Sequence, residues 1–313
     1  NLESIENQTR RLKIIEKQFL KRSKSNPFLL GGKTVYGIMP DWNPAEIIGI
    51  RPRPLATSLY KELITNNIWA EQRFSYGYRD VRGFPLMKTF FGMPYIDIRL
   101  CFNSFIPRDL NDQLAEKLVN FYLEKLIKNP KLHDKVEFEV VISCYAFNME
   151  KRKKELIDKG FSKNECNLIL SSLKKLTQKI INQKNGFWSK DLDSIYELER
   201  KRNIVKNSDL SHFEKIYYLI NLTKKYGTLP FAGLARTAFI NVELLKSLID
   251  IGVFSKIDYD QFISSINTVS YSLAADTLKL NKKEFLEKYG HLRPGTYDIL
   301  SPRYDQAPDL YFD

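Results

Sequence analysis

The sequence predicts an α+β fold that is mostly helical, with a small, mainly antiparallel sheet formed by the N-terminal half. Apolar side chains alternate with polar ones only in stretches before residue 148, whereas residues 149–290 repeat apolar side chains at helical spacing. Hydrophobic residues make up 43% of the 313 positions, which is enough to bury a large core. Because strands come early and helices late, α+β is favoured over a doubly wound α/β sheet.

The chain is basic, with a formal charge of +12 at pH 7. This balance fits a nucleic acid, an anionic membrane surface or a phosphorylated small molecule as partner. The lysines are mixed with glutamates along helical segments, and no zinc-finger spacing, RNA-binding aromatic signature or arginine-rich arm is present. No apolar run reaches membrane-spanning length. We therefore expect neither a nucleic acid nor a membrane as partner.

The three cysteines, Cys101, Cys144 and Cys166, lie far apart in the sequence. They fit buried thiols in a reducing cytoplasm better than a disulfide framework, and two of them fall in predicted strands. No signal peptide is visible, and the chain begins at Asn1 inside a helical pattern rather than at a methionine. We expect a cytoplasmic protein and a segment of a longer polypeptide.

A single domain is expected, with a sheet-containing part at about 30–148, a helical part at about 149–290 and a C-terminal motif loop at 290–313. In the first part, period-two alternation predicts the strands and amphipathic spacing predicts the helices. Ser162 and Glu165 form a capping box that opens a helix in the second part. Strands are expected at 33–39, 95–105 and 136–145, and helices at 1–23, 55–74, 109–128, 162–184, 195–205, 211–226, 229–251 and 256–280.

Residues 40–54 join the first strand to a helix, and prolines prevent either element from continuing through them. A rigid loop crowded with charged and amide side chains is a common place for ligand-binding groups. The alternative is a turn with a helix cap, supplied by Asp41 or Asn43. The other polar side chains of the loop are Glu46, Arg51 and Arg53.

Residues 75–85 interrupt the helical pattern with two glycines, two tyrosines and charged side chains. Arg79 and Arg82 could present guanidinium groups to a phosphate or a carboxylate. Alternatively, they form surface salt bridges with Asp80 or Glu71.

The predicted strand at 95–105 places Asp97, Arg99 and Asn103 on one face, because side chains alternate with period two. This face forms either the polar floor of a pocket or a structural pair of Asp97 with Arg99. In the strand at 136–145, Glu137 and Glu139 also share a face. Paired carboxylates suit acid–base or metal chemistry, although ion pairing with Arg99 is the favoured alternative.

The helical half contains Arg236 in an apolar, small-residue stretch, where a lone arginine must reach a carboxylate, a phosphate or solvent. After the helical pattern stops near residue 290, the chain carries His291, Arg293, Asp298 and Arg303. A lone histidine such as His291 is more often a hydrogen-bonded structural residue than a catalyst.

Residues 289–299 resemble a glycine- and arginine-containing segment of the phosphoenolpyruvate-utilising enzymes, which include pyruvate phosphate dikinases, phosphoenolpyruvate synthases and rifampicin phosphotransferases. Residues 39–49, 76–80 and 102–107 are similar to the synthase-like proteins of capsule and surface-polysaccharide clusters. Within this group the chain most resembles the L-glutamine kinases of capsular phosphoramidate biosynthesis. The resemblance covers nearly the whole chain and corresponds to the central, substrate-binding domain.

The resemblance implies a phosphotransferase in which ATP and Mg²⁺ bind a preceding ATP-grasp domain and a following domain carries a phosphohistidine. ATP would phosphorylate that histidine, with release of AMP and phosphate, and the histidine would pass its phosphoryl group to the side-chain amide of L-glutamine. None of the three histidines here lies in the phosphocarrier context. We therefore expect this chain to bind the acceptor, to hold no cofactor or metal, and not to turn over alone.

The same resemblance suggests roles for the candidate residues. The acceptor carboxylate would bind Arg99 or Arg236, and its amide would bind Asn43 or Asn103. Its ammonium would bind Asp41, Glu46 or Asp97, while His291 and Arg293 are the candidate catalytic residues. The remaining candidate substrate-binding residues are Arg51, Arg53, Arg79, Arg82, Asp298 and Arg303.

Three alternatives to this function stay open. The same machinery could act on another acceptor, such as pyruvate or a sugar or glycerol derivative. A basic helical nucleic-acid-binding module would show binding that weakens steeply with salt. A purely structural interaction domain would contain no small-ligand pocket.

Overall fold

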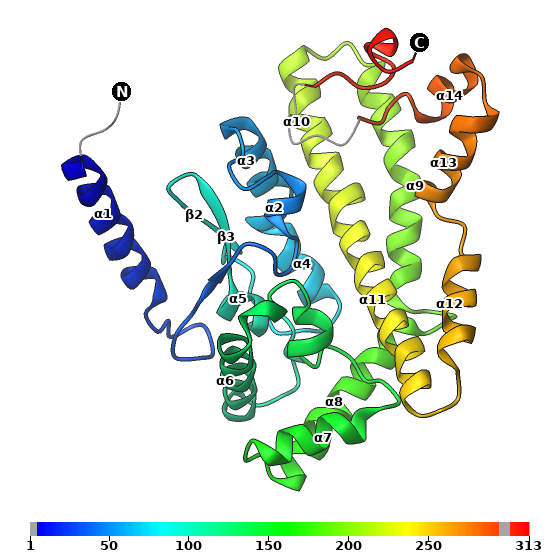
Figure 1. The fold of residues 1–313 in the computed structure, drawn as a ribbon. Coiled ribbons are helices and arrows are strands. Elements are labelled where there is room, and N and C mark those ends of the chain that lie inside the picture. The colour runs from blue at the N-terminus through cyan, green and yellow to red at the C-terminus, as the bar shows by residue number, and fades with distance from the viewer. Residues whose placement is uncertain (1–4, 294–300, 313) are drawn as a thin grey trace. The chain divides into compact units, whose positions relative to one another are not determined.

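A computed structural model of the protein describes residues 5–293 and 301–312 (Figure 1). The chain divides into two compact units, Asn1–Ser247 and Leu248–Asp313. The division falls inside the long helix α11 (Leu229–Asp250). The expected arrangement as one domain with boundaries near residues 149 and 290 stays a prediction, and the two units are described separately.

The first unit confirms the predicted fold class, because it combines many helices with one small antiparallel sheet. The sheet has the order β1-β3-β2, with β1 at Tyr36–Gly37, β2 at Met87–Phe90 and β3 at Met93–Asp97. Strand β2 has no counterpart among the predicted strands. It pairs with β3 in a tight hairpin, whose two connecting residues, Phe91 and Gly92, both have positive φ angles of 54° and 78°.

The predicted strand at 95–105 is wrong beyond Asp97. The side chain of Asp97 accepts a hydrogen bond of 3.2 Å from the backbone N–H of Leu100 and caps helix α5 (Ile98–Asn103). A cap of this kind satisfies a backbone donor that a helix start leaves unpaired, so the chain turns from strand to helix at this residue. As a result, Arg99 and Asn103 do not share a strand face with Asp97.

The predicted strand at 136–145 is also wrong. Residues Val136–Val140 form a π-helical turn, η3, closed by a 2.9 Å bond from the N–H of Val141 to the carbonyl oxygen of Val136. Val136 and Val140 are both buried and lie four residues apart, a spacing that fits one helical turn as well as a strand. In this turn Glu137 lines a cavity and Glu139 is exposed, so the two carboxylates point apart.

The predicted helix at 55–74 is interrupted. Helix α3 (Pro54–Tyr60) runs into a π-helical turn, η1 (Lys61–Thr65), and α4 (Ile68–Ser75) follows after a break at Asn66 and Asn67. The capping box at Ser162 is confirmed as the start of α8. The other helices of this unit are α1 (Ile5–Ser23), α2 (Pro44–Ile47), α6 (Asp112–Lys128), η2 (Pro130–Leu132), α7 (Met149–Asp158), α8 (Lys163–Ile181), α9 (Phe187–Lys206), α10 (His212–Leu222) and η4 (Thr223–Thr228).

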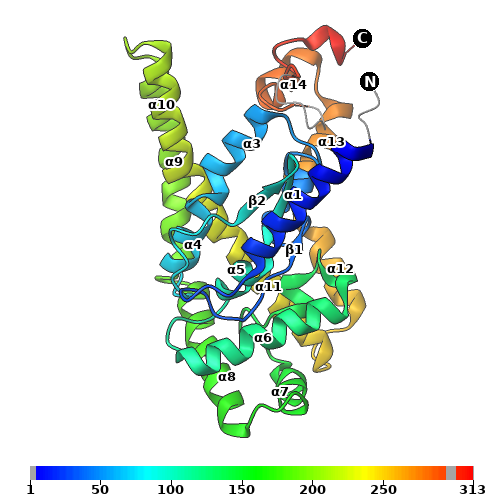
Figure 2. The ribbon, with the colours of Figure 1, turned by 90° about the vertical axis from the view of Figure 1, so that its left-hand side faces the viewer.

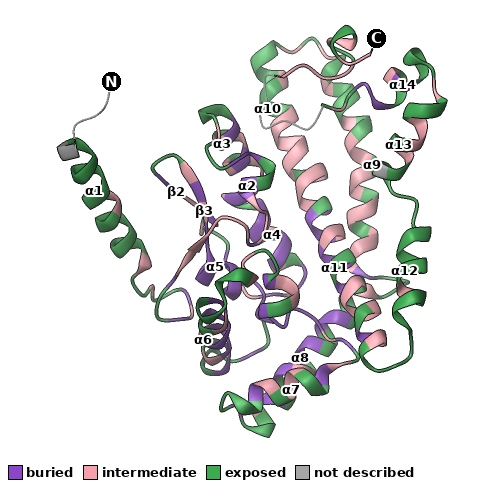
Figure 3. Cartoon of the chain, in the orientation of Figure 1, coloured by how far each residue is buried: buried purple, intermediate pink, exposed green. Residues whose placement is uncertain are grey.

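The core of the first unit lies where α4, α5, α6 and α8 meet, and the buried residues gather there in Figure 3. Trp69 of α4 and Phe102 of α5 are among its largest fully buried side chains. Helix α1 runs past the sheet in Figure 2, and Phe19 places its ring edge-on against Tyr36 of β1 at 5.4 Å between ring centres. This core fixes the loop after β1 relative to α4.

The second unit contains α12 (Lys256–Ser265), α13 (Val269–Lys279), α14 (Lys282–Tyr289) and η5 (Pro308–Leu310). The helix predicted over 256–280 is broken before Thr268, whose side chain accepts the N–H of Tyr271 at 3.2 Å and caps α13. Helix α14 ends at Tyr289, as the sequence predicts. The Tyr289 hydroxyl donates to Asp276 at 2.7 Å and ties α14 to α13.

Cys101, Cys144 and Cys166 are all buried and free, which confirms the prediction of buried thiols. Cys101 lies in α5 and Cys144 in a loop, however, and not in strands. Among the described residues, the helices are each too short or too polar to cross a membrane.

Candidate functional site

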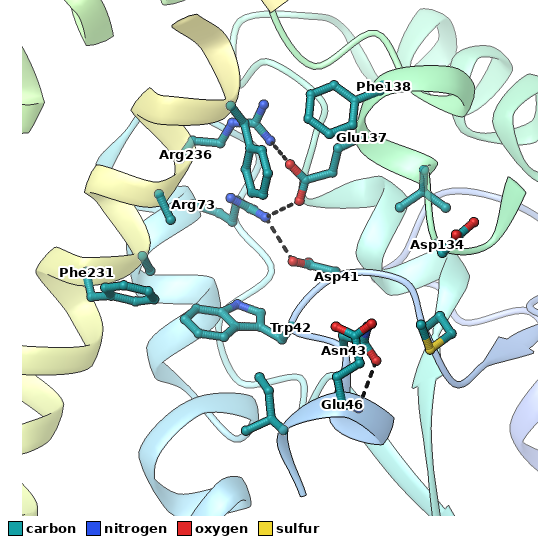
Figure 4. Close-up of a pocket in the computed structure, with 16 residues that line it drawn as sticks. Asp41, Trp42, Asn43, Glu46, Arg73, Asp134, Glu137, Phe138, Phe231 and Arg236 are labelled. Carbon is teal, nitrogen blue, oxygen red and sulfur yellow. Dashed lines mark hydrogen bonds and ion pairs between the residues drawn. The ribbon is translucent and has the colours of Figure 1, made fainter. Parts of the chain in front are cut away.

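A cavity of about 380 Å³ lies within the first unit, beside the loop that follows β1 (Figure 4). Four segments line it, namely the loop with α2, the end of α4, the π-turn η3 with the residues before it, and α11. Most of its walls are apolar, and a few polar groups converge at one side, which is the usual composition of a small-molecule site.

The loop holds its side chains in a conformation that costs backbone strain. Asp41 and Trp42 have φ angles of 43° and 40°, in the left-handed region that such residues rarely adopt. The Tyr60 hydroxyl donates to the carbonyl oxygen of Trp42, and the Asn43 side chain accepts the N–H of Glu46 at 3.2 Å to cap α2. Both interpretations of this loop are therefore compatible, because it caps a helix and also lines a cavity.

Two arginines and two carboxylates form an alternating chain of charges along one side of the cavity, drawn in Figure 4. Nη2 of Arg73 lies 3.2 Å from Oδ1 of Asp41 and 3.7 Å from Oε1 of Glu137. The other oxygen of Glu137 accepts from Nη1 of Arg236 at 2.7 Å. The exposed fractions of the side chains are only 1% for Arg236, 4% for Asp41, 6% for Arg73 and 11% for Glu137.

Burying four charges is unfavourable unless each is paired, and apolar replacements often stabilise a fold better. The buried charge chain faces a cavity and is therefore the candidate ligand-binding feature of this unit. Burial raises the pKa of Glu137, while the guanidinium groups of Arg236 and Arg73 act in the opposite direction. The arginines thus favour the ionised form of Glu137 and burial favours the protonated form, and burial is the larger effect, so the pKa is raised.

Arg236 is held from several sides. Its Nη2 donates to Oγ of Ser143 at 2.9 Å, and its guanidinium lies over the rings of Phe105 and Phe239 at 5.4 and 5.9 Å from their centres. The sequence expectation that this arginine must reach a carboxylate is met by Glu137. The sequence suggested that Glu137 pairs with Arg99, and this is wrong. The π-turn η3 directs the Glu137 side chain toward Arg236 of α11 and Arg73 of α4.

Aromatic rings form the walls of the cavity. Trp42 and Phe231 lie 6.5 Å apart between ring centres, and Phe138 lies edge-on to Phe239 at 5.4 Å. Glu46 and Asp134 lie at the exposed part of the lining, and neither pairs with a cation within the described residues. Four carboxylates and two guanidinium groups therefore line the cavity, and 2 − 4 gives a formal charge of −2.

The cavity brings together four of the candidate substrate-binding residues, in addition to Glu137, which the sequence singled out as a carboxylate paired with Glu139. Asp41, Asn43 and Glu46 come from the loop and Arg236 comes from α11, about 190 residues later. Arg51 and Arg53, at the far end of the same loop, are exposed and do not line the cavity. Only the first part of the proline-rich segment therefore faces the cavity.

Arg79 and Arg82 lie outside the cavity, in surface ion pairs. Arg79 contacts Asp112 at 2.8 Å. Arg82 contacts Asp80 at 2.8 Å and Glu71 at 3.7 Å, so its salt-bridge alternative is the one that the structure confirms.

Asp97, Arg99 and Asn103 are buried but also lie outside the cavity, where they fasten the N-terminal segment to α5. Asp97 accepts from the Thr34 hydroxyl at 2.6 Å. Arg99 donates from Nη1 to the carbonyl oxygens of Lys24 and Gly31, at 3.0 and 3.4 Å. Asn103 both donates to and accepts from the backbone of Leu30.

The C-terminal candidates belong to the second unit. His291 and Arg293 follow α14 and are exposed. Arg303 forms an ion pair with Asp305 at 2.8 Å. Asp298 lies outside the described residues, together with most of the motif at 289–299.

Sequence reasoning missed Arg73, Trp42 and Phe231 as cavity residues. Arg73 carried a signal, because it lies four positions after Trp69 and therefore on the buried face of α4. A cation at such a position requires a buried partner. Phe231 was less accessible to prediction, since an aromatic residue near the start of an apolar helix is usually part of a core.

Comparison of the chain with protein-family models, with curated proteins and with solved structures found no match.

Proposed function

We propose that this chain is the acceptor-binding part of an ATP-dependent phosphotransferase that works through a phosphohistidine, and that its acceptor is L-glutamine. The observation that supports the proposal is the buried chain of alternating charges beside an aromatic cavity. The overall reaction is ATP, L-glutamine and water to AMP, phosphate and glutamine phosphorylated on its amide nitrogen. The reaction type is the one that the sequence resemblance implies, and the cavity supports an amino acid as the class of acceptor.

An amino acid matches the cavity in size and in charge. Its carboxylate requires donors such as a guanidinium group, its ammonium requires carboxylate oxygens, and the lining offers both. The formal charge of −2 favours a ligand that carries a cationic group and disfavours pyruvate or phosphoenolpyruvate, which are purely anionic. A neutral sugar or glycerol derivative would leave the buried charges without a role.

The contribution of this chain to catalysis would be to position the acceptor and to exclude water. Transfer of a phosphoryl group passes through a loose transition state, so most of the acceleration comes from alignment and electrostatics. The aromatic rings around Trp42 and Phe231 would limit access of water to the reacting amide. ATP, Mg²⁺ and the phosphohistidine would be supplied by other segments, in the cytoplasm, as the resemblance implies.

Calorimetric titration of the chain tests the proposal with L-glutamine, L-glutamate, pyruvate and phosphoenolpyruvate. We expect saturable binding of L-glutamine and an increase in melting temperature that follows its concentration. A chain that binds pyruvate or phosphoenolpyruvate in preference to L-glutamine would favour the other-acceptor alternative. Binding of RNA or DNA that weakens steeply with salt, with no amino-acid binding, would favour the nucleic-acid alternative.

A further inference from the structure

The two arginines of the charge chain differ in how closely their terminal nitrogens contact hydrogen-bond acceptors. Both terminal nitrogens of Arg236 make short bonds, at 2.7 Å to Glu137 and 2.9 Å to Ser143. All polar contacts of Arg73 are longer, at 3.2 Å to Asp41, 3.2 Å to Gln72 and 3.7 Å to Glu137. The Nε atoms of both arginines are buried with no hydrogen-bond partner, so the two side chains differ only at their terminal nitrogens. Arg73 therefore has donor capacity left for a ligand, whereas the terminal nitrogens of Arg236 are committed to the fold.

The two oxygens of Glu137 differ in the same way. Oε2 is held by Arg236 at 2.7 Å, while Oε1 is 3.7 Å from Arg73, beyond the range of a good hydrogen bond. Glu137 is also the most exposed of the four charged side chains. Among the carboxylate oxygens of Asp41 and Glu137, Oε1 of Glu137 is therefore the one best placed to accept a hydrogen bond from a ligand.

We infer that Arg73 and Oε1 of Glu137 form a subsite for the two charges of an α-amino acid, which rests on the proposed function of the cavity. Arg73 binds the α-carboxylate, and Oε1 of Glu137 accepts from the α-ammonium. The ligand bridges the 3.7 Å contact and replaces one long ion pair by two short, charge-assisted bonds. The cavity thereby selects for molecules that carry an ammonium and a carboxylate bonded to the same carbon.

Arg236 acts in this subsite as a positioning residue. It fixes the Glu137 carboxylate through Oε2 and is itself fixed by Ser143 and by the Phe105 and Phe239 rings. Oε1 is thereby held toward Arg73 before the ligand arrives. Preorganisation of this kind lowers the cost of ordering side chains on binding.

The side chain of the amino acid then extends along the walls formed by Trp42 and Phe231, toward Asn43. The amide oxygen of Asn43 is occupied by the α2 cap, whereas its amide nitrogen makes no hydrogen bond within the described residues. That nitrogen can donate to the carbonyl oxygen of a glutamine side chain. The amide nitrogen of the glutamine, which accepts the phosphoryl group, stays free.

Titration calorimetry with three related ligands tests the subsite on the unmodified chain. L-glutamine carries both charges, its α-amide lacks the carboxylate charge, and glutaramate lacks the ammonium. Loss of one charge-assisted bond is expected to weaken each analogue about 10- to 100-fold relative to L-glutamine. Equal affinity of either analogue and L-glutamine would overturn the inference.

Variants assign each charge to its residue. Arg73→Gln should weaken L-glutamine about 10- to 100-fold and leave the affinity for the α-amide almost unchanged, because that ligand has no carboxylate to lose. Glu137→Gln should weaken L-glutamine and the α-amide together, and leave glutaramate almost unchanged. Arg200→Gln, which alters an exposed arginine paired with Glu197 on α9, serves as the matched control.

The outcomes separate the inference from the proposed function. If L-glutamine binds and Arg73→Gln binds it equally well, the subsite is refuted and the proposed acceptor stands. If another α-amino acid binds in place of L-glutamine and needs both charges, the subsite stands and the proposed acceptor fails. Binding of no α-amino acid refutes both.

Circular dichroism and melting curves establish whether each variant folds. If Arg73→Gln does not fold, Arg73→Lys replaces it, because lysine keeps the positive charge but lacks the two-pronged guanidinium geometry.

Discussion

The hydroxyl of Tyr76 donates to the carboxylate of Asp191 at 2.6 Å and joins the end of α4 to the start of α9. The third helix at this contact is α11, where Gly233 packs so closely that a Cβ atom would lie 1.8 Å from the Asp191 oxygen and 2.6 Å from the Tyr76 hydroxyl oxygen. Burial raises the pKa of Asp191 to about 6, against an ordinary value of 3.8. This pair lies outside the cavity lining and gives the fold a titratable contact.

The raised pKa predicts how stability depends on pH. Between about pH 4 and pH 6 the folded chain keeps the proton of Asp191 while the unfolded chain has lost it, so stability falls as pH rises through this window. Asp191→Asn cannot titrate and should lose this part of the pH dependence. Urea unfolding of both proteins across the window measures the difference. Identical pH profiles would show that Asp191 titrates normally in the fold.

Gly233→Ala should destabilise the protein by about 1–3 kcal/mol, because the added methyl group overlaps Asp191 and Tyr76. Gly227→Ala is the matched control, since a Cβ at that helical position would meet nothing closer than 3.5 Å. The control should be neutral or stabilising by up to about 1 kcal/mol, as expected for replacing a helical glycine. Chemical denaturation measures both. Removing the clash with Asp191→Ala should recover part of the loss, and strict additivity of the two changes would contradict the proposed overlap.

Arg236→Met should cost about 3–5 kcal/mol, because it leaves the Glu137 carboxylate buried without its closest partner. The double variant Arg236→Met with Glu137→Gln removes the unpaired charge and should be more stable than the single variant. Denaturant unfolding at neutral pH measures both. A double variant less stable than the single one would mean that Glu137 is solvated without Arg236.

Two arginines outside the cavity should respond very differently to replacement. Arg79→Gln removes a surface ion pair with the largely exposed Asp112 and should change stability by less than about 1 kcal/mol. Arg99→Gln removes bonds to the carbonyl oxygens of Lys24 and Gly31 in a buried site and should cost about 1.5–3 kcal/mol. Thermal and urea unfolding compare the two. Similar losses for both would show that Arg99 is not a structural anchor.

The predicted fold class is confirmed because it depends on average composition and period, which are properties of long segments. The secondary structure of a short segment is less well determined by composition and period. Residues 98–103 are apolar enough to suit a strand, and the chain becomes a helix there because the side chain of Asp97 captures the N–H of Leu100. A single cap bond decides between two states that the apolar pattern leaves nearly equal.

The candidate site was partly predictable for a related reason. Asp41, Asn43 and Glu46 lie in one short, proline-rich loop, where the sequence itself displays the crowding of polar groups. Arg73 and Glu137 become site residues only through contacts with segments 32 and 99 residues away. No local pattern states which distant carboxylate an arginine meets, so the sequence assigned Glu137 to Arg99 instead of Arg236 and Arg73.

The π-turn η3 makes the charge chain sensitive to the length of its backbone. A π-turn closes its hydrogen bond over five residues, as Val141 does to Val136, and so holds one residue more than an α-turn. Deleting one residue from Val136–Val140 would allow an ordinary α-turn and rotate the following chain by about 100° about the helix axis. Ser143, the second partner of Arg236, would then face another way. A one-residue deletion in this segment would therefore separate Arg236 from Ser143 even if every charged residue were retained.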